Sequence, residues 1–190
     1  KRDSRKSRGL GDVYKTQVFQ DPYGSFNPRQ KIGRLITEPF FTLGREAPPE
    51  TEQKIIAQKM LKEVGLSSES IEKYIHEFSG GQRQRIAIAR ALVIKPKLII
   101  FDEAVSALDV SIKSQILKLI SDLTERYGLS YLFISHDLTV IENITENCLV
   151  MKNGKIVERG QTKHILRDPK NEYTLSLINA APKFPNFLHA

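Results

Sequence analysis

Cysteine is nearly absent, since Cys148 is the only one in a chain of 190 residues. A single thiol can build neither a disulfide framework nor a cysteine metal site, so the fold is expected to depend on neither. Cys148 lies within the apolar residues 148–151, which indicates a buried, reduced thiol. This usage agrees with a cytosolic compartment.

Long hydrophobic runs are absent as well. The longest candidate, residues 87–94, is interrupted by Arg90, whereas a helix that spans a bilayer needs about 20 apolar residues. The charged N-terminal residues are not followed by an apolar region, so no secretory signal peptide is expected. Any role at a membrane is therefore expected to depend on a partner.

Outside its first residues the chain has little excess positive charge, despite a net charge of +7. Residues 1–16 contribute +4 of this charge and show no hydrophobic period, so we expect a basic head that is disordered or foreign to the domain. A charge excess in the head, and not on a folded face, argues against a nucleic-acid partner. The alternative is a non-enzymatic module that binds nucleic acid through the head; its binding would depend strongly on salt and on residues 1–16.

The apolar residues that are present alternate between two patterns. Helical spacing occurs in residues 52–64, 81–94 and 112–123. Continuous apolar runs, typical of buried strands, occur at 98–101 and 131–134. Because these strands are apolar throughout and are separated by helices, the sequence predicts an α/β fold with a parallel sheet covered on both faces.

Turn signals mark further boundaries. A short strand-like run at 17–20 ends at the turn 21–24, and residues 25–50 are rich in loops, with one short helix. Near the end of the chain Asn153 and Gly154 separate two apolar runs, which predicts a β-hairpin.

Both buried strands end in residues that suit phosphate chemistry. Asp102 and Glu103 directly follow the first strand, and Ser135, His136 and Asp137 follow the second. At the carboxyl end of a strand, one carboxylate can hold Mg²⁺ through water while the next polarises the water that attacks a phosphate. The alternative is that acidic residues simply begin the loop after a strand. A hydrolase triad in the second group is not expected, because neighbours in an extended segment point in different directions.

A further polar group lies at the start of the helix at 81–94. Ser79 and Gln82 fit a capping box, so a helix start alone explains them. A helix start does not explain Gly80 and Gly81, because glycines lower helix stability. They do let the backbone approach a ligand closely. A hydroxyl, bare N–H groups and a helix N-terminus together suit a phosphate anion.

Several segments resemble the motifs of ABC-transporter ATPases, in that family's order. Residues 78–92 (FSGGQRQRIAIARAL) resemble the signature segment, and residues 98–103 resemble the Walker B motif. The segments that resemble the D-loop, the switch histidine motif and the Q-loop are 106–109, 134–137 and 18–22. The resemblance covers residues 17–160. It implies a P-loop NTPase-like parallel sheet flanked by helices, truncated at the N-terminus, with an inserted helical subdomain.

The resemblance implies a role for each matching residue. Asp102 would position Mg²⁺, and Glu103 would be the general base for water that attacks the γ-phosphate of ATP. His136 would contact that phosphate, and Gln20 would lie near the metal and sense the membrane partner. A second ATPase subunit is also implied, whose ATP would be clamped by Ser79, Gly80, Gly81 and Gln82, with Asp109 communicating across the dimer.

Two stretches are similar to the importer ATPases for oligopeptides, dipeptides and nickel, namely residues 19–29 and the tail 168–182. An ordinary helix with a proline-containing end is the alternative for the tail. The implied partners are transmembrane permease subunits and, indirectly, a substrate-binding protein, at the cytoplasmic face of the membrane. A soluble ABC ATPase of translation or DNA repair is the alternative, and it would not co-purify with membranes.

The resemblance divides the chain into a non-matching head, a partial ATPase domain and a C-terminal extension of the importer type. The boundaries that we expect are 1–16 for the head, 17–167 for the domain with its helical subdomain at 28–78, and 168–190 for the extension.

One motif of the family is lacking. No Gly-x-x-x-x-Gly-Lys-[Ser/Thr] occurs in the chain, and Gly9 and Gly11 have neither the spacing nor the lysine. That loop cradles the phosphates with backbone N–H groups. We therefore expect that the chain as given does not hydrolyse ATP, that its head reflects a truncated or chimeric reading frame, and that missing strands leave apolar surface exposed.

Overall fold

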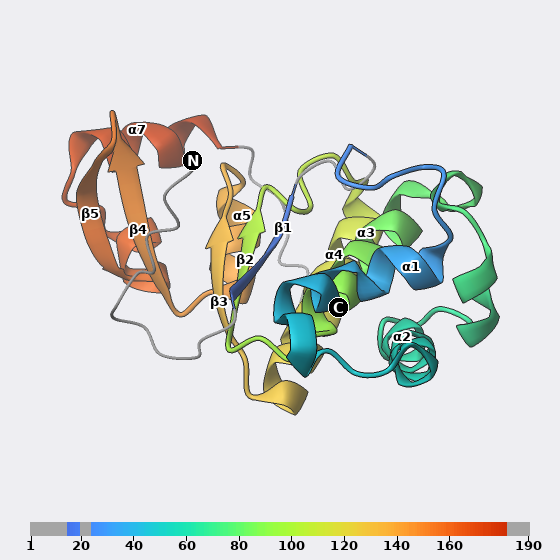
Figure 1. Cartoon of the computed structure of the whole chain (residues 1–190). Helices are drawn as coiled ribbons and strands as arrows, with labels where there is room; N and C mark the ends of the chain where they lie inside the picture. The colour runs from blue at the N-terminus through green and yellow to red at the C-terminus, as the bar shows by residue number, and fades with distance from the viewer. Residues whose placement is uncertain (1–14, 20–23, 182–190) are drawn as a thin grey trace.

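A computed structural model describes residues 15–19 and 24–181, and a three-stranded parallel sheet lies at its centre (Figure 1). The strands β1 (Lys15–Val18), β2 (Leu98–Asp102) and β3 (Ser130–Ile134) are paired in the order β1-β2-β3. In the register, Val18 is paired with Phe101 and Asp102 with Ile134. Because the strands are parallel, their carboxyl ends share one edge. The predicted α/β class is confirmed.

The first strand differs from its prediction at both ends. It begins at Lys15, whereas the sequence pattern placed its start at Gln17, and it ends at Val18, so that Phe19 lies beyond it. Lys15 and Thr16, assigned above to the basic head, are therefore part of the sheet. Polar residues in an edge strand give no apolar run, which is why the pattern missed them.

A group of short helices precedes the second strand. It contains α1 (Ile32–Thr37), η1 (Glu38–Glu46), α2 (Glu50–Glu63), η2 (Ser68–Glu72) and η3 (Ile75–Glu77), of which the η elements are 3-10 helices, and it leads into α3 (Gly80–Leu92). In Figure 1 these elements lie on the side of β1, away from the hairpin. α1 and α2 pack against each other and against α3. Their fully buried side chains include Ile32, Leu35, Leu61 and Ile75.

The sheet is covered by helices on one face only, among the residues that the structure describes. Alternate strand residues point to opposite faces, and Ile99, Phe101 and Phe133 are buried on the face covered by α3, α4 (Val110–Tyr127) and α5 (Leu138–Ile144). On the other face Leu132 is 47% exposed and Ile134 is 43% exposed. The prediction of cover on both faces was therefore wrong for this part of the chain, whereas the expected exposure of apolar surface is present.

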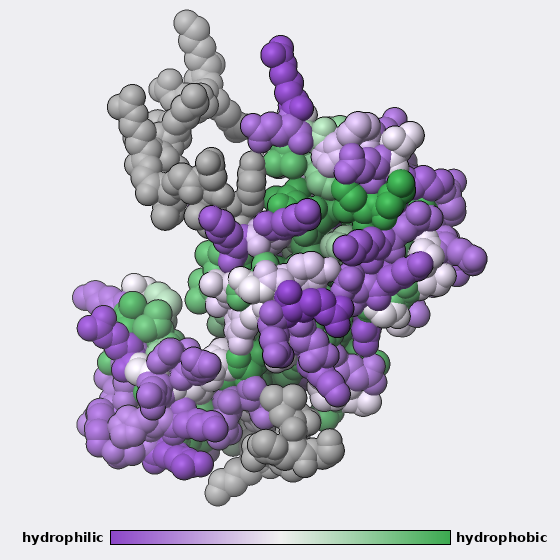
Figure 2. Space-filling view, turned by 90° about the horizontal axis from the view of Figure 1, so that it is seen from below, coloured by the Kyte–Doolittle hydropathy of each residue, from purple (hydrophilic) through white to green (hydrophobic). Residues whose placement is uncertain are grey.

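A β-hairpin forms a second unit beside β3 (Figure 1). β4 (Asn147–Lys152) and β5 (Lys155–Gln161) are antiparallel, and the loop residues Asn153 and Gly154 have φ values of 50° and 75°. Two left-handed residues match the twist of a tight hairpin turn, so the predicted hairpin is confirmed. The helices α6 (Thr162–Arg167) and α7 (Glu172–Ala180) follow. Figure 2 shows hydrophobic side chains facing the hollow between the hairpin unit, at the lower left, and the rest of the molecule.

Cys148 in β4 is partly exposed, so the prediction of a buried thiol was wrong. Its thiol is free, and partial burial raises the pKa of this thiol. None of the described helices has the length and apolar character that crossing a membrane requires.

Candidate functional site

The shared edge of the parallel strands brings three of the predicted residues to one place. Asp102 is the last residue of β2, Glu103 follows it, and His136 lies in the loop after β3. Asp102 accepts a hydrogen bond at Oδ2 from Gln17 Nε2 of β1, at 3.2 Å. Polar side chains from β1, from the end of β2 and from the loops after β2 and β3 thus lie at this edge, as expected for the carboxyl ends of an open parallel sheet.

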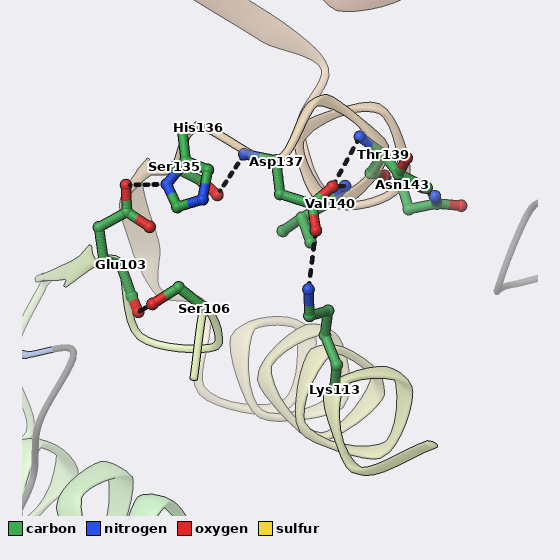
Figure 3. A network of polar contacts seen from close by, with 9 residues as sticks. All are labelled: Glu103, Ser106, Lys113, Ser135, His136, Asp137, Thr139, Val140 and Asn143. Carbon is green, nitrogen blue, oxygen red and sulfur yellow. Dashed lines mark hydrogen bonds and ion pairs between the residues drawn. The ribbon is translucent and has the colours of Figure 1, made fainter. Parts of the chain in front are cut away.

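The backbone of Glu103 is held in an unusual conformation. Its φ of 52° lies in the left-handed region, which a non-glycine residue adopts at an energetic cost. Its N–H donates to the Ile134 carbonyl at 2.9 Å. Its own carbonyl accepts from the Ser106 hydroxyl at 2.8 Å, as Figure 3 shows. The surrounding turn therefore fixes where this side chain points.

The Glu103 carboxylate faces the His136 ring. Oε1 lies 2.8 Å from His136 Nδ1, and the side chain of Glu103 is 23% exposed while that of His136 is 77% exposed (Figure 3). The second carboxylate oxygen, Oε2, is buried and has no hydrogen-bond partner among the described residues. A buried polar atom without a partner needs a reason, and an acceptor site for a bound water or ligand provides one. The pair thus combines a half-buried base with an exposed polar ring.

Asp137, next to His136, is engaged away from the ring. Its Oδ1 accepts from the backbone N–H groups of Thr139 and Val140 at 3.1 and 3.3 Å, and its Oδ2 accepts from Lys113 Nζ at 2.7 Å (Figure 3). Burial raises the pKa of Asp137, but the Lys113 hydrogen bond and charge and the two backbone N–H groups outweigh it, so this pKa lies below its ordinary value. The carboxylate therefore caps α5 and, among the described residues, forms no hydrogen bond with the His136 ring.

The second predicted group lies at the start of α3. Ser79 is the N-cap residue, its Oγ accepts from Gln82 N–H at 3.4 Å, and Gln82 Oε1 accepts from Ser79 N–H at 3.0 Å. This is the capping box that the sequence predicts. Ser79 and Gln82 therefore cap the N-terminus of α3, and both residues are also exposed.

The two glycines after Ser79 have different surroundings. A Cβ added to Gly81 would lie 2.5 Å from Ile112 Cγ2 of α4, so this glycine permits the close approach of two helices. Gly80 is exposed, and the nearest atom to an added Cβ is Leu108 Cδ2 at 3.8 Å. Only Gly80 therefore offers bare backbone at the surface, whereas packing accounts for Gly81.

Asp109 lies beside this group, at the start of α4. It is the N-cap residue of that helix, and its Oδ1 accepts from Ile112 N–H at 2.9 Å. Within the part of the chain that the structure describes, no hydrogen bond joins Ser79, Gln82 or Asp109 to Glu103 or His136. The predicted residues thus form two separate groups, one at the strand ends and one at the starts of α3 and α4.

Two site predictions concern the metal. Gln20 lies outside the described residues, so its position is not part of the site geometry. In residues 15–19 and 24–181 there is no cluster of three or more His, Cys, Asp or Glu side chains that could hold an ion. Mg²⁺ is usually bound through one or two carboxylates, with waters and substrate phosphates as its other ligands. The Asp102 carboxylate, at the end of β2, fits that donor set.

A family model described as ABC transporter matches residues 11–106, half of the chain. The chain belongs to the ABC transporter family. The match begins at Gly11, before the first motif recognised in the sequence at Val18. It includes the start of α3 and the end of β2, so both groups of candidate residues lie partly within it. The resemblance inferred from the motifs is therefore confirmed.

The similarity to curated relatives covers more of the chain than the family match does. The dipeptide transport ATP-binding protein DppF of Haemophilus influenzae is 47% identical over 170 residues, which cover 89% of this chain and 51% of the relative. The glutathione import ATP-binding protein GsiA of Escherichia coli O6:H1 is 50% identical over 165 residues, which cover 87% of this chain and 26% of the relative. The chain thus spans about half of the length of the dipeptide transport relatives.

Solved structures share the fold. The cbiO1 protein of Clostridium perfringens, described as part of the ABC transporter complex cbiONQ, has a TM-score of 0.70 and 28% identity, over 81% of this chain and 59% of that chain. A putative metal-chelate type ABC transporter in an inward-facing conformation has a TM-score of 0.72 at 24% identity, over 87% of this chain and 63% of that chain. The predicted ABC ATPase fold is confirmed.

Proposed function

We propose that this chain is part of an ATP-hydrolysing subunit that energises an importer for dipeptides or oligopeptides. The observation that carries the proposal is the 2.8 Å contact between Glu103 and His136, beside Asp102 at the strand ends. The identity of 47% to dipeptide transport ATP-binding proteins supports the substrate class.

The chemistry at the strand ends follows from the donor groups. Glu103 accepts a proton from water at its carboxylate, whose buried Oε2 has no hydrogen-bond partner among the described residues. The oxygen of that water forms a bond to the γ-phosphorus of ATP while the bond from this phosphorus to the β–γ bridging oxygen breaks. His136, mostly exposed and in contact with Glu103 at Nδ1, is placed to contact a γ-phosphate oxygen through the Nε2 side of its ring. Asp102, together with Gln20, would hold Mg²⁺, which neutralises charge on the phosphate oxygens when it is bound.

The group at the starts of α3 and α4 acts on a different nucleotide. Ser79, Gly80 and Gln82 are exposed at a helix N-terminus, where phosphate oxygens are stabilised. The resemblance of residues 78–92 to the ABC signature segment supports the inference that this group clamps the ATP of a second ATPase subunit. Gly81 allows the close packing against α4 that places Asp109 beside the clamp.

The remaining partners follow from the importer assignment. Transmembrane permease subunits bind the ATPase near residues 20–77, and a substrate-binding protein delivers cargo to them. The subunit is then peripheral, at the cytoplasmic face of the membrane. Co-purification with membrane fractions that contain the permeases tests this assignment, and an ATPase that stays in the supernatant would favour a non-transport role.

ATP hydrolysis is best tested in a chimera in which the first half of the Escherichia coli dipeptide relative precedes Lys15 of this chain. We expect Mg²⁺-dependent hydrolysis, with kcat lowered about 10²- to 10³-fold by Glu103→Gln because the proton acceptor is lost. Glu125→Gln, an exposed carboxylate on α4, is the matched control and should leave kcat unchanged. The chain by itself, which contains no phosphate loop, is expected to be inactive.

Full activity of the Glu103→Gln chimera would contradict the assignment of the base. Hydrolysis by the unmodified chain alone, lost on Glu103→Gln, would contradict the expectation that it needs a phosphate loop.

A further inference from the structure

Lys113 and Asp137 form an ion pair between two helices. Lys113 lies in the second turn of α4, and its Nζ is 2.7 Å from Oδ2 of Asp137, the N-cap residue of α5. The two side chains are 14% and 26% exposed. An ion pair that is partly buried is screened less by solvent and salt than a surface pair, and this pair is the most buried of the ion pairs among the described residues.

The carboxylate that Lys113 binds also fixes the loop around His136. Asp137 Oδ1 caps the N-terminus of α5 through Thr139 and Val140, and the Asp137 N–H donates to Ser135 Oγ at 3.0 Å. The residues on both sides of His136 are therefore held by one hydrogen-bonded turn (Figure 3). Because the ring is largely exposed, this turn and the Glu103 contact are what restrict its position.

Lys113 is also linked to the start of α4. The Lys113 N–H donates to the Asp109 carbonyl at 2.8 Å, within the turn that the Asp109 side chain caps. A movement of this turn therefore moves Lys113, and Lys113 is bonded to the turn that carries His136. The chain of contacts runs from the group at the start of α4 to the group at the strand ends, between which the described residues show no direct hydrogen bond.

We propose that Lys113 is a positioning residue, which couples the first turns of α4 to the His136 loop and keeps His136 against Glu103. The proposal rests on the proposed function, because it concerns two nucleotide sites. Lys113 would link the position of the ATP site at the strand ends to the position of the group that clamps the second nucleotide. Lys113 does not touch ATP in this arrangement; it acts through Asp137.

A purely structural ion pair would make a different prediction. It would stabilise the contact between α4 and α5 without any effect on the ring of His136. The experiment therefore needs a readout at the ring itself, and one that requires neither ATP nor hydrolysis.

Histidine ring signals in two-dimensional NMR spectra of the full chain provide that readout, with His76 and His164 as internal references. In Lys113→Met we expect the His136 ring signal to move while the signals of both references stay in place. Amide hydrogen exchange at Thr139 and Val140 should accelerate about tenfold, because the capping carboxylate loses its charged partner. Lys113→Arg, which keeps the charge and the donor, should restore the His136 signal.

Two further variants make the test specific. Lys118→Met removes an exposed lysine from the same helix and should leave the His136 signal unchanged. Asp137→Asn retains an oxygen that can cap α5 but weakens the attraction to Lys113, so it should move the same signal. The double variant Lys113→Met with Asp137→Asn should move the signal no further than the single variants, because both changes break one contact.

An unmoved His136 signal in both Lys113→Met and Asp137→Asn, with a lowered melting temperature, would overturn the proposal in favour of a purely structural pair. An equal shift in Lys118→Met would overturn it as well. These outcomes are distinct from a failure of the proposed function, which would appear as an inactive chimera with the His136 coupling still intact.

Discussion

The helical and sheet region up to residue 144 and the hairpin region after it are stabilised in different ways. Among the described residues, only Ile165 of the buried hydrophobic side chains lies after residue 144. In the hairpin, Leu149, Met151 and Ile156 are each more than half exposed. The first region therefore depends on burial of apolar surface, whereas the second has almost no core of its own.

The hairpin region is organised by local hydrogen bonds instead. Glu158 of β5 accepts from the backbone N–H groups of Lys170 and Asn171 at 2.8 and 3.3 Å, and Lys152 Nζ lies 4.6 Å from the centre of the Tyr173 ring. Such exposed polar contacts each contribute little to stability. Two regions that are both built of helices and strands can therefore differ widely in their sensitivity to substitution.

The largest effect is expected from a core substitution. Ile86 of α3 is fully buried, so Ile86→Ala should lower the free energy of unfolding by about 2 to 5 kcal/mol, through lost transfer energy and a cavity. Urea unfolding followed by circular dichroism measures this change. The matched control is Ile156→Ala in the hairpin, where the side chain is largely exposed and the loss should stay below about 0.5 kcal/mol. Equal losses at the two positions would remove the distinction between the regions.

An intermediate effect is expected where α3 and α4 touch. Gly81→Ala places a Cβ against the stiff, β-branched Ile112 and should cost about 1 to 3 kcal/mol by overpacking. Gly80→Ala, which has room for the new methyl group, should be neutral or slightly stabilising. In an Ile112→Ala background the cost of Gly81→Ala should vanish, and a double-mutant cycle on unfolding free energies measures this. A cost that persists there would mean that the clash is not its cause.

The smallest effect is expected in the hairpin turn. Gly154 has φ of 75° and open space around it, so Gly154→Ala adds only backbone strain, about 1 kcal/mol. Because the hairpin adds little to the core, we expect faster amide exchange in β4 and β5 with an almost unchanged global unfolding midpoint. Asn153→Gly, which tolerates the same left-handed conformation, is the control and should change neither quantity. A shift of the global midpoint as large as that of Ile86→Ala would show that the hairpin unfolds together with the core.

Sequence patterns predicted the elements whose signals are local. The helical spacing at 81–94 became α3, the apolar runs became β2 and β3, and the Asn153–Gly154 turn became the hairpin. Each of these elements depends on the spacing of apolar residues or on turn residues within about ten positions, and this information is present in a single sequence. The capping box at Ser79 belongs to the same class.

The side of the sheet that helices cover was not predictable in this way. An apolar strand indicates burial on both faces, but the sequence does not say which segments provide the cover. Leu132 and Ile134 therefore looked like core residues and are exposed among the described residues. The start of β1 was missed for a related reason, since a polar edge strand is defined by its neighbour β2 and not by its own pattern.

The candidate site also contains residues that sequence motifs predict and residues that only the fold brings together. Motif order identified Asp102, Glu103 and His136, and the structure places Glu103 against His136. Lys113 and Gln17 were missed, because each contacts its partner only through the fold and neither stands in a recognisable motif. Spacing offered one usable signal for Lys113, namely its position four residues after Asp109, which places it on the helix face above the N-cap.

The left-handed backbone of Glu103 sets the stability of the fold against the role proposed for this residue as the base. Asn and Gly adopt a φ of 52° at lower cost than Glu, so Glu103→Gly or Glu103→Asn would relieve strain and remove the carboxylate together. Selection for thermal robustness alone would drive this position away from glutamate. A variant library sorted only for folding is therefore expected to become enriched in chains that are more stable and that lack the carboxylate proposed to act as the base.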